Sequence, residues 1–156
     1  MCLIAGTGKA IASGTAPKTV ATGWTYHAHY AADSLYASKD STIKTYSTIK
    51  HAISLTLVIS PSSVPPGGIY KVYGYLKDNS ASGAPPLSSK TITFTATSPI
   101  TIPSKSTDAT GKYTADLLKA PTKTGSYNTQ AHFAGNSLYS AKDSPKMTLT
   151  VTTSFP

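Results

Sequence analysis

The chain has 156 residues, 39% of them hydrophobic, and carries 14 lysines and 6 aspartates but neither arginine nor glutamate. This length allows one or two small domains, and the lack of glutamate and arginine disfavours long helices, whereas 24 Thr and 10 Tyr residues favour strands. No run of about 18 apolar residues occurs, so the sequence excludes a transmembrane helix, and the regular spacing of its apolar residues excludes a disordered chain.

The formal net charge of +8 raises the question of a nucleic-acid partner. Nucleic-acid sites favour arginine, which binds phosphate and guanine through two parallel hydrogen bonds, and the lysines here are scattered along the chain. We therefore expect no nucleic-acid partner and interpret the lysines as residues that keep a polar β-surface soluble. Cys2 is the single cysteine, so an intrachain disulfide is excluded.

In chain order, Gly6-Thr7-Gly8-Lys9 comes first, and it lacks both the hydroxyl residue after lysine and the upstream glycine of a phosphate-binding loop. Strands are expected near 24–30 and 43–49. Trp24, Tyr26 and Tyr30 form an apolar stripe along the first of these segments. The stripe has no partner within residues 1–50, so we expect it to be buried by something outside that segment.

From residue 51 onward, apolar residues alternate with polar ones in about seven short segments separated by turns. Turn signals lie at 64–68, 78–86 and 108–111, and Pro61 ends the first segment. This pattern predicts an all-β, two-sheet antiparallel sandwich. The residues expected to face its core are Ile53, Leu55, Leu57, Ile59, Tyr70, Val72, Gly74, Leu76, Ile92, Phe94, Ala96, Tyr113, Ala115, Leu117, Tyr127, Thr129, Ala131, Phe133, Met147, Leu149 and Val151.

An internal repeat with a constant offset of 103 residues connects the two parts of the chain. Residues 28–41 read AHYAADSLYASKDS and residues 131–144 read AHFAGNSLYSAKDS, so that nine of 14 positions are identical. The match extends back to the Gly-Lys pairs at 8–9 and 111–112, and Trp24 aligns with Tyr127. A period near 100 residues predicts tandem copies of one domain.

Only the second repeat is complete, because about 60 residues from Ala52 onward precede its Gly-Lys pair, whereas seven residues precede the first pair. We therefore predict that residues 1–50 are the C-terminal half of an incomplete module and that residues 51–156 are a complete module. A lone half-sandwich cannot bury its apolar face. Its missing strands must come from another chain or from sequence beyond these 156 residues.

Several motifs of the second repeat carry a family resemblance. In chain order they are Ser60-Pro61-Ser62-Ser63-Val64, Val72-Tyr73-Gly74, Pro86-Leu87, Thr107-Asp108-Ala109-Thr110-Gly111-Lys112-Tyr113 and Gly135-Asn136-Ser137-Leu138-Tyr139. With these motifs the chain resembles the bacterial and archaeal Ig-like repeat domains of cell-surface proteins, of the adhesin or S-layer type. The resemblance covers residues 52–152 fully and residues 8–50 as a half repeat. It implies an Ig-like sandwich, and it leaves the function open because such modules serve as spacers, adhesins and envelope subunits.

The polar residues of the repeated motif are candidate metal ligands that lack sufficient partners. His29 and His132 occupy equivalent positions and should face solvent, and His27 shares a strand face with His29 without a third ligand. Asp33 and Asp40, like their counterparts in the second repeat, offer only two oxygen ligands for calcium. We interpret these side chains as caps of turns and predict no metal site and no cofactor.

Two tyrosines of the second repeat, Tyr73 and Tyr75, should lie on the outward face of their strand if Val72 and Gly74 point inward. Exposed aromatic side chains on a β-surface can stack on sugars or on another subunit. The alternative is that both are ordinary strand residues, half covered by the stems of neighbouring lysines.

These observations predict an extracellular structural protein of the cell surface, a subunit of a filament, sheath or surface layer with adhesion as an added role. The chain would be its own partner in a head-to-tail homopolymer built by strand complementation. The alternative is a carbohydrate-binding or spacer module of a larger secreted protein, with surface glycans as partners. The sequence has no glutamate and no nucleophile motif, so we predict no enzyme. The subunit-interface candidates are Trp24, Tyr26, Tyr30, Ile43 and Tyr46.

Overall fold

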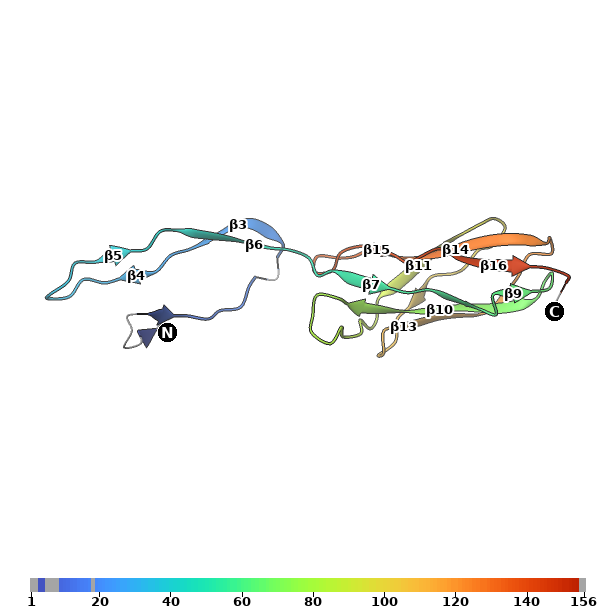
Figure 1. Cartoon of the computed structure of the whole chain (residues 1–156), viewed down its shortest axis with the longest axis horizontal. Coiled ribbons are helices and arrows are strands. Elements are labelled where there is room, and N and C mark those ends of the chain that lie inside the picture. Colours follow the sequence, from blue (N-terminus) through green and yellow to red (C-terminus); the bar gives the residue numbers. More distant parts are fainter. Residues whose placement is uncertain (1–2, 5–8, 18, 155–156) are drawn as a thin grey trace. The chain divides into compact units, whose positions relative to one another are not determined.

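The computed structural model of the chain describes residues 3–4, 9–17 and 19–154 (Figure 1). This part of the chain is built from strands without a helix, which confirms the all-β prediction. It divides into two compact units, Met1–Ile49 and Lys50–Pro156, which are called unit 1 and unit 2 below. Among the described residues, therefore, no helix is available to cross a membrane.

Unit 2 contains two sheets that lie one above the other (Figure 1). In the first sheet, β10 pairs with β13 on one side and with both β7 and β8 on the other, in each case antiparallel. The strands of this sheet are β7 (Ile53–Leu55), β8 (Val58–Ser60), β10 (Ile69–Asp78) and β13 (Lys112–Lys119).

The second sheet of unit 2 has the order β12-β11-β14-β16-β9, with β15 also paired to β14. Its pairs are antiparallel except that of β16 with β9, which is parallel. The strands are β9 (Ser63–Val64), β11 (Thr91–Ala96), β12 (Lys105–Ser106), β14 (Gly125–Phe133), β15 (Lys142–Asp143) and β16 (Met147–Val151).

The core of unit 2 is formed by apolar side chains from both sheets. Val72 and Leu76 of the first sheet and Ile92 and Leu149 of the second are completely buried in one cluster. Full burial of such a side chain contributes roughly 1.5–3 kcal/mol, so this shared cluster holds the two sheets together. All the residues that the alternating pattern predicted to face the core are buried or partly buried, except Leu117 and Met147.

The predicted first strand is broken at Thr56 and Leu57, between β7 and β8, although Leu57 remains buried. At the break, the backbone of Thr56 lies directly against Gly74 of β10. A Cβ atom on Gly74 would lie 2.0 Å from the Thr56 carbonyl oxygen, so the contact requires glycine. The Tyr113 hydroxyl donates a hydrogen bond to the same carbonyl, which satisfies a group that the interrupted ladder leaves free.

The prediction that Leu117 faces the core is wrong, because β13 contains a β-bulge. Tyr70 pairs with Leu118 and Val72 pairs with Ala115, so β13 has two residues where β10 has one. This extra residue reverses the alternation, and Leu117 is 82% exposed with a φ of 54°. Leu118 packs against the core in its place.

Met147 is the second exception to the predicted core. It is 36% exposed, whereas Leu149 and Val151 of the same strand are buried. Met147 is the first residue of β16, so it lies at the end of that strand, where the core covers less of it.

Unit 1 consists of three short antiparallel pairs. The strands pair as β1 with β2, β3 with β6 and β4 with β5. None of the residues at 9–17 and 19–49 is buried, so the described part of unit 1 has no core of its own. The strands are β1 (Leu3–Ile4), β2 (Ala10–Ile11), β3 (Ala21–Tyr26), β4 (His29–Tyr30), β5 (Lys39–Asp40) and β6 (Lys44–Thr48).

Two buried threonines of unit 2 allow a matched test of this packing. The Thr107 hydroxyl accepts a hydrogen bond from the Lys90 amide at 2.9 Å and donates one to the Leu87 carbonyl at 2.6 Å. The Thr129 hydroxyl has no partner among the described residues. Replacing an unpaired buried hydroxyl by a methyl group of the same shape removes a desolvation cost, whereas replacing a paired one leaves its partners unsatisfied.

We therefore expect Thr129→Val to raise the free energy of unfolding by about 1 kcal/mol and Thr107→Val to lower it by about 1–3 kcal/mol. Urea titration of the two variants beside the parent chain measures both effects. Equal losses of stability in the two variants would contradict the assignment of Thr129 as an unpaired group.

Candidate assembly surface

The internal repeat has the same local structure in both units. In unit 1, His29 of β4 pairs with Asp40 of β5, and in unit 2, His132 of β14 pairs with Asp143 of β15. In both pairs the histidine Nδ1 is hydrogen-bonded to the aspartate Oδ1. The two histidines are exposed or half-exposed and lie outside the core, as expected for turn-proximal polar residues.

The turn that follows these histidines is also the same in both units. Asp33 accepts hydrogen bonds from the amides of Leu35 and Tyr36 at 2.8 and 2.7 Å. Its counterpart, Asn136, accepts equivalent bonds from the amides of Leu138 and Tyr139, both at 2.8 Å. These side chains therefore cap turns. Hydrogen bonds to the Asp33 carboxylate, first from the Tyr30 hydroxyl and then from the two amides, hold its pKa below the ordinary value.

The pairing register of the longer strands follows the same offset of 103 residues. Trp24 of β3 pairs with Tyr46 of β6, as Tyr127 of β14 pairs with Leu149 of β16. The strands β3 and β4 together are therefore the counterpart of β14, β5 is the counterpart of β15, and β6 is the counterpart of β16. Unit 1 reproduces one side of the second sheet of unit 2.

The two units differ in what covers this sheet. In unit 2, β14 is continuous and pairs with β11, and its Gln130 and Ala131 lie opposite Thr95 and Phe94. At the counterpart residues 27–28 of unit 1, the strand is interrupted between β3 and β4. Within the described residues of unit 1, no strand occupies the place of β11 or of the first sheet. This edge of β3 and β4 has no further strand partner there, and residues 12–16 line an open hollow of about 460 Å³ with Thr25, Tyr26 and Tyr46 without forming a covering sheet.

The uncovered face of unit 1 is aromatic. The rings of Trp24 and Tyr46 stack with centroids 6.4 Å apart, and Tyr26 lies against Tyr46 at 6.0 Å. Tyr26 is 59% exposed and Tyr46 is 38% exposed, and Tyr30 is exposed to a similar degree. We call Trp24, Tyr26, Tyr30 and Tyr46 the aromatic face.

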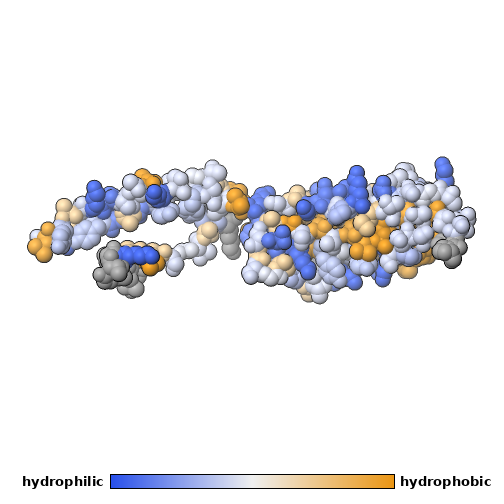
Figure 2. All heavy atoms as spheres, in the orientation of Figure 1, coloured by the Kyte–Doolittle hydropathy of each residue, from blue (hydrophilic) through white to orange (hydrophobic). Residues whose placement is uncertain are grey.

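The counterparts of these residues in unit 2 show what this kind of face requires. Tyr127, Thr129, Phe133 and Leu149 are all buried, and they contact the core that the two sheets share. Ile43, the fifth interface candidate, is 65% exposed beside the aromatic face. Figure 2 shows further strongly apolar residues, in orange, at the surface of unit 1 among polar ones. The structure brings Trp24, Tyr26 and Tyr46 into contact, with Trp24 partly buried, and leaves Tyr30 and Ile43 exposed.

The two tyrosines predicted to be exposed in unit 2 are covered in part by lysines. Tyr73 is half-buried and Tyr75 is exposed on the outer face of β10. The Nζ atoms of Lys71 and Lys112 lie 5.7 and 5.1 Å from the centre of the Tyr73 ring, and that of Lys77 lies 5.9 Å from the Tyr75 ring. Ammonium groups over these rings favour cation–π contacts and hinder stacking of a sugar.

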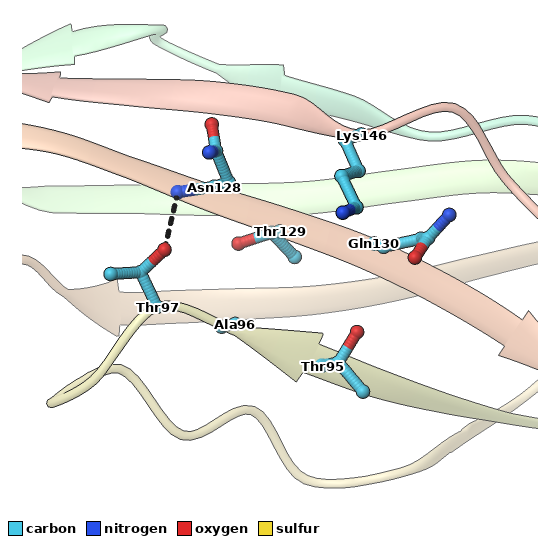
Figure 3. Close-up of a pocket in the computed structure, with 7 residues that line it drawn as sticks. All are labelled: Thr95, Ala96, Thr97, Asn128, Thr129, Gln130 and Lys146. Carbon is cyan, nitrogen blue, oxygen red and sulfur yellow. Dashed lines mark hydrogen bonds between the residues drawn. The ribbon is translucent and has the colours of Figure 1, made fainter.

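A polar hollow of about 260 Å³ lies on the outer side of the second sheet (Figure 3). Figure 3 shows the Lys146 side chain extending toward β14, between Asn128 and Gln130 in this view. Most of these polar groups already bond within the protein, since Thr97 accepts from the Asn128 amide at 3.1 Å and Gln130 donates to the Ser144 carbonyl at 2.8 Å. The hollow has no aromatic lining. Nothing in its geometry selects a ligand.

In the part of the chain that the structure describes, no three His, Cys, Asp or Glu side chains converge in a manner that could hold a metal ion. Cys2 and the predicted Gly-Thr-Gly-Lys segment, apart from Lys9, lie outside the described residues. The histidines near the aromatic face contribute only the two-membered pair of His29 and Asp40, whose hydrogen bond holds the pKa of Asp40 below its ordinary value.

Sequence reasoning missed one exposed apolar site, formed by Ile69 and Leu117 of unit 2. Ile69 begins β10 and Leu117 lies at the bulge of β13, and both are exposed. The repeat held a signal for it, because the counterpart of Leu117 is Gly14. Glycine is the residue expected at a positive φ, so a leucine there marks an unusual position.

No protein-family model matches the sequence, and no curated protein matches it. The fold defines the chain as an all-β protein with one unit that has a core and a second unit whose described residues have none.

A hydrogen bond between a buried carboxylate and a partly exposed histidine supports unit 2 near its first strand. Asp78 is buried at the end of β10, and its carboxylate is 2.6 Å from Nδ1 of His51. Burial alone raises the pKa of Asp78, but the hydrogen bonds from His51 and the Ser80 amide outweigh it, so the pKa lies below the ordinary value. Ionised Asp78 therefore stabilises the fold above its unfolded pKa, and this contribution is lost as pH falls through the lower folded value.

We expect the free energy of unfolding of unit 2 to decrease as pH falls below about 4, the ordinary pKa of aspartate. Asp78→Asn should make this decrease shallower, because the substituted side chain cannot titrate. Denaturant titrations between about pH 6 and pH 2 measure the slope of the free energy of unfolding against pH. Substitution of an exposed aspartate, Asp116→Asn, is the control. An unchanged acid slope in Asp78→Asn would refute the assignment.

Proposed function

We propose that the chain is an extracellular structural subunit of the cell surface, which assembles with other molecules of itself into a filament, sheath or surface layer. The observation that carries the proposal is the aromatic face of unit 1, which is uncovered although its counterparts in unit 2 are buried. In this proposal another molecule covers the face and completes the sheet by strand complementation.

The proposal includes an Ig-like fold for unit 2. Its support is the two-sheet arrangement with a shared core, the mainly antiparallel pairing and the sequence motifs that resemble surface Ig-like repeats. The same resemblance supports the extracellular location, together with the richness in Ser and Thr and the low fraction of charged residues, 13%.

The energetics favour a contact that combines apolar burial with strand pairing. Burial of the four aromatic side chains would contribute roughly 1.5–3 kcal/mol each. Association of two molecules costs about 4–15 kcal/mol in lost translational and rotational freedom. The apolar contribution is thus similar in size to the cost. Backbone hydrogen bonds at the open edge of β3 and β4, where residues 27–28 interrupt the strand, would supply the surplus.

Carbohydrate binding is a weaker candidate. The tyrosines proposed for sugar stacking, Tyr73 and Tyr75, have lysine ammonium groups over their rings. The polar hollow of Figure 3 lacks the aromatic platform that sugar recognition uses. A passive spacer would leave the aromatic face of unit 1 without a role.

Electron microscopy and light scattering over a series of chain concentrations test the proposal. We expect regular fibres or sheets, and particles whose mass grows with concentration. A variant that lacks residues 1–50 should remain folded and monomeric, because unit 2 has a complete core of its own. A full chain that stays monomeric at every concentration, or a deletion variant that still polymerises, would contradict the proposal.

A further inference from the structure

A shallow hollow of about 400 Å³ lies on unit 2 where the start of β10 meets the bulge of β13. Its apolar lining includes Pro61, Ile69 and Leu117, and Lys71 and Asp116 stand at its rim. Ile69 is 54% exposed and Leu117 is 82% exposed. The hollow is therefore an apolar surface that the fold of unit 2 leaves open.

Two features make Leu117 unfavourable for the stability of unit 2 by itself. Its φ of 54° is in the left-handed region, which side chains with a Cβ adopt at a cost, and its side chain is in solvent. The first repeat has Gly14 at the equivalent position in the sequence, so the leucine is not shared by the two repeats. A leucine at 117 gains nothing from the fold of unit 2, so a contact outside unit 2 accounts for it.

Resting on the proposed function, we infer that the aromatic face of one molecule docks onto the Ile69–Leu117 hollow of another molecule. Both surfaces are apolar and uncovered, and aromatic side chains fill shallow apolar hollows well at interfaces. One pair of opposite charges is available, because Lys44 lies opposite Tyr26 in the β3–β6 pair and Asp116 lines the hollow beside Lys71.

Chain length identifies the occupant as another molecule. Four residues lie between Tyr46 and His51, so five Cα–Cα steps join them and span at most about 17 Å. His51 forms a bridge with Tyr139 within unit 2, and from there β7 and β8 lead to Pro61 at the hollow. The ten residue steps from His51 to Pro61 cover about 33 Å where the chain is extended. This length exceeds the span of about 17 Å between Tyr46 and His51, so Tyr46 does not reach the hollow of its own chain. Figure 1 shows β7 starting at the β15 end of unit 2, whereas β9 and the C-terminus lie at the other end.

The contact joins two different surfaces of the same chain, so it does not close on itself. A repeated head-to-tail contact of this kind adds one molecule after another and produces an open fibre. The inference thus names the two surfaces that would meet in the proposed polymer.

The substitution Leu117→Gly tests the hollow, because it copies the residue of the first repeat. Glycine relieves the strained backbone, so the melting temperature of unit 2 should be unchanged or higher. The chain concentration at which assembly begins should rise at least tenfold. Met147→Gln is the matched control, since it removes an exposed apolar side chain of unit 2 outside the hollow and should leave assembly unchanged.

A charge exchange tests the direct contact. Asp116→Lys should weaken assembly by placing a second positive charge beside Lys44 of the docked molecule, and adding Lys44→Asp in the same chain should restore it. Assembly of Leu117→Gly at the parental concentration would overturn the inference while leaving the proposed function intact. A parent chain that never assembles would overturn both. Loss of assembly in Met147→Gln to the same extent as in Leu117→Gly would also overturn the inference.

Discussion

The apolar face of a β-sheet must be covered by a second layer, because a single layer leaves its inward side chains in water. In unit 2 the first sheet covers the second, and residues such as Val72 and Leu149 are buried between them. The sheet of unit 1 repeats the register of β14 and β16, but its described residues include no covering layer. The function proposed for the chain follows from this one unmet requirement.

The internal repeat acts as a control within the molecule. The His–Asp pair, the capped turn and the strand register at residues 24–26 are the same in both units, so these features form without a second sheet. A continuous long strand forms only in unit 2, where β14 pairs with β11. In unit 1, residues 27–28 interrupt its counterpart. The local sequence therefore builds the hairpin, and pairing with a neighbouring strand completes it.

Alternation of apolar residues predicted most of the core of unit 2, since each predicted strand alternates with period two and most of its inward residues are buried. It failed at Leu117, because an extra residue in β13 shifts the alternation and no local pattern marks the bulge. It also missed the strand break at Thr56, which arises from the close approach to Gly74, a residue distant in sequence.

The candidate site was predictable in part. The stripe of Trp24, Tyr26 and Tyr30 follows from alternation, and its lack of a partner within residues 1–50 follows from the repeat. Neighbouring lysines beside Tyr73 are one of the two alternatives for this residue, but the contact from Lys112 could not be predicted, because it comes from a neighbouring strand whose register the sequence does not reveal. The hollow at Ile69 and Leu117 depends on the same register and on the bulge.

The fluorescence of Trp24, the single tryptophan of the chain, tests the central claim most directly. Trp24 is partly buried beside Tyr46 in the single molecule, and its emission should shift from the dilute-solution value to shorter wavelength over the concentration range in which light scattering increases. Such a joint transition is the result that the account predicts, because assembly then covers the aromatic face. An emission maximum that stays constant while the particles grow would show that the molecules assemble through another surface, and would contradict the account.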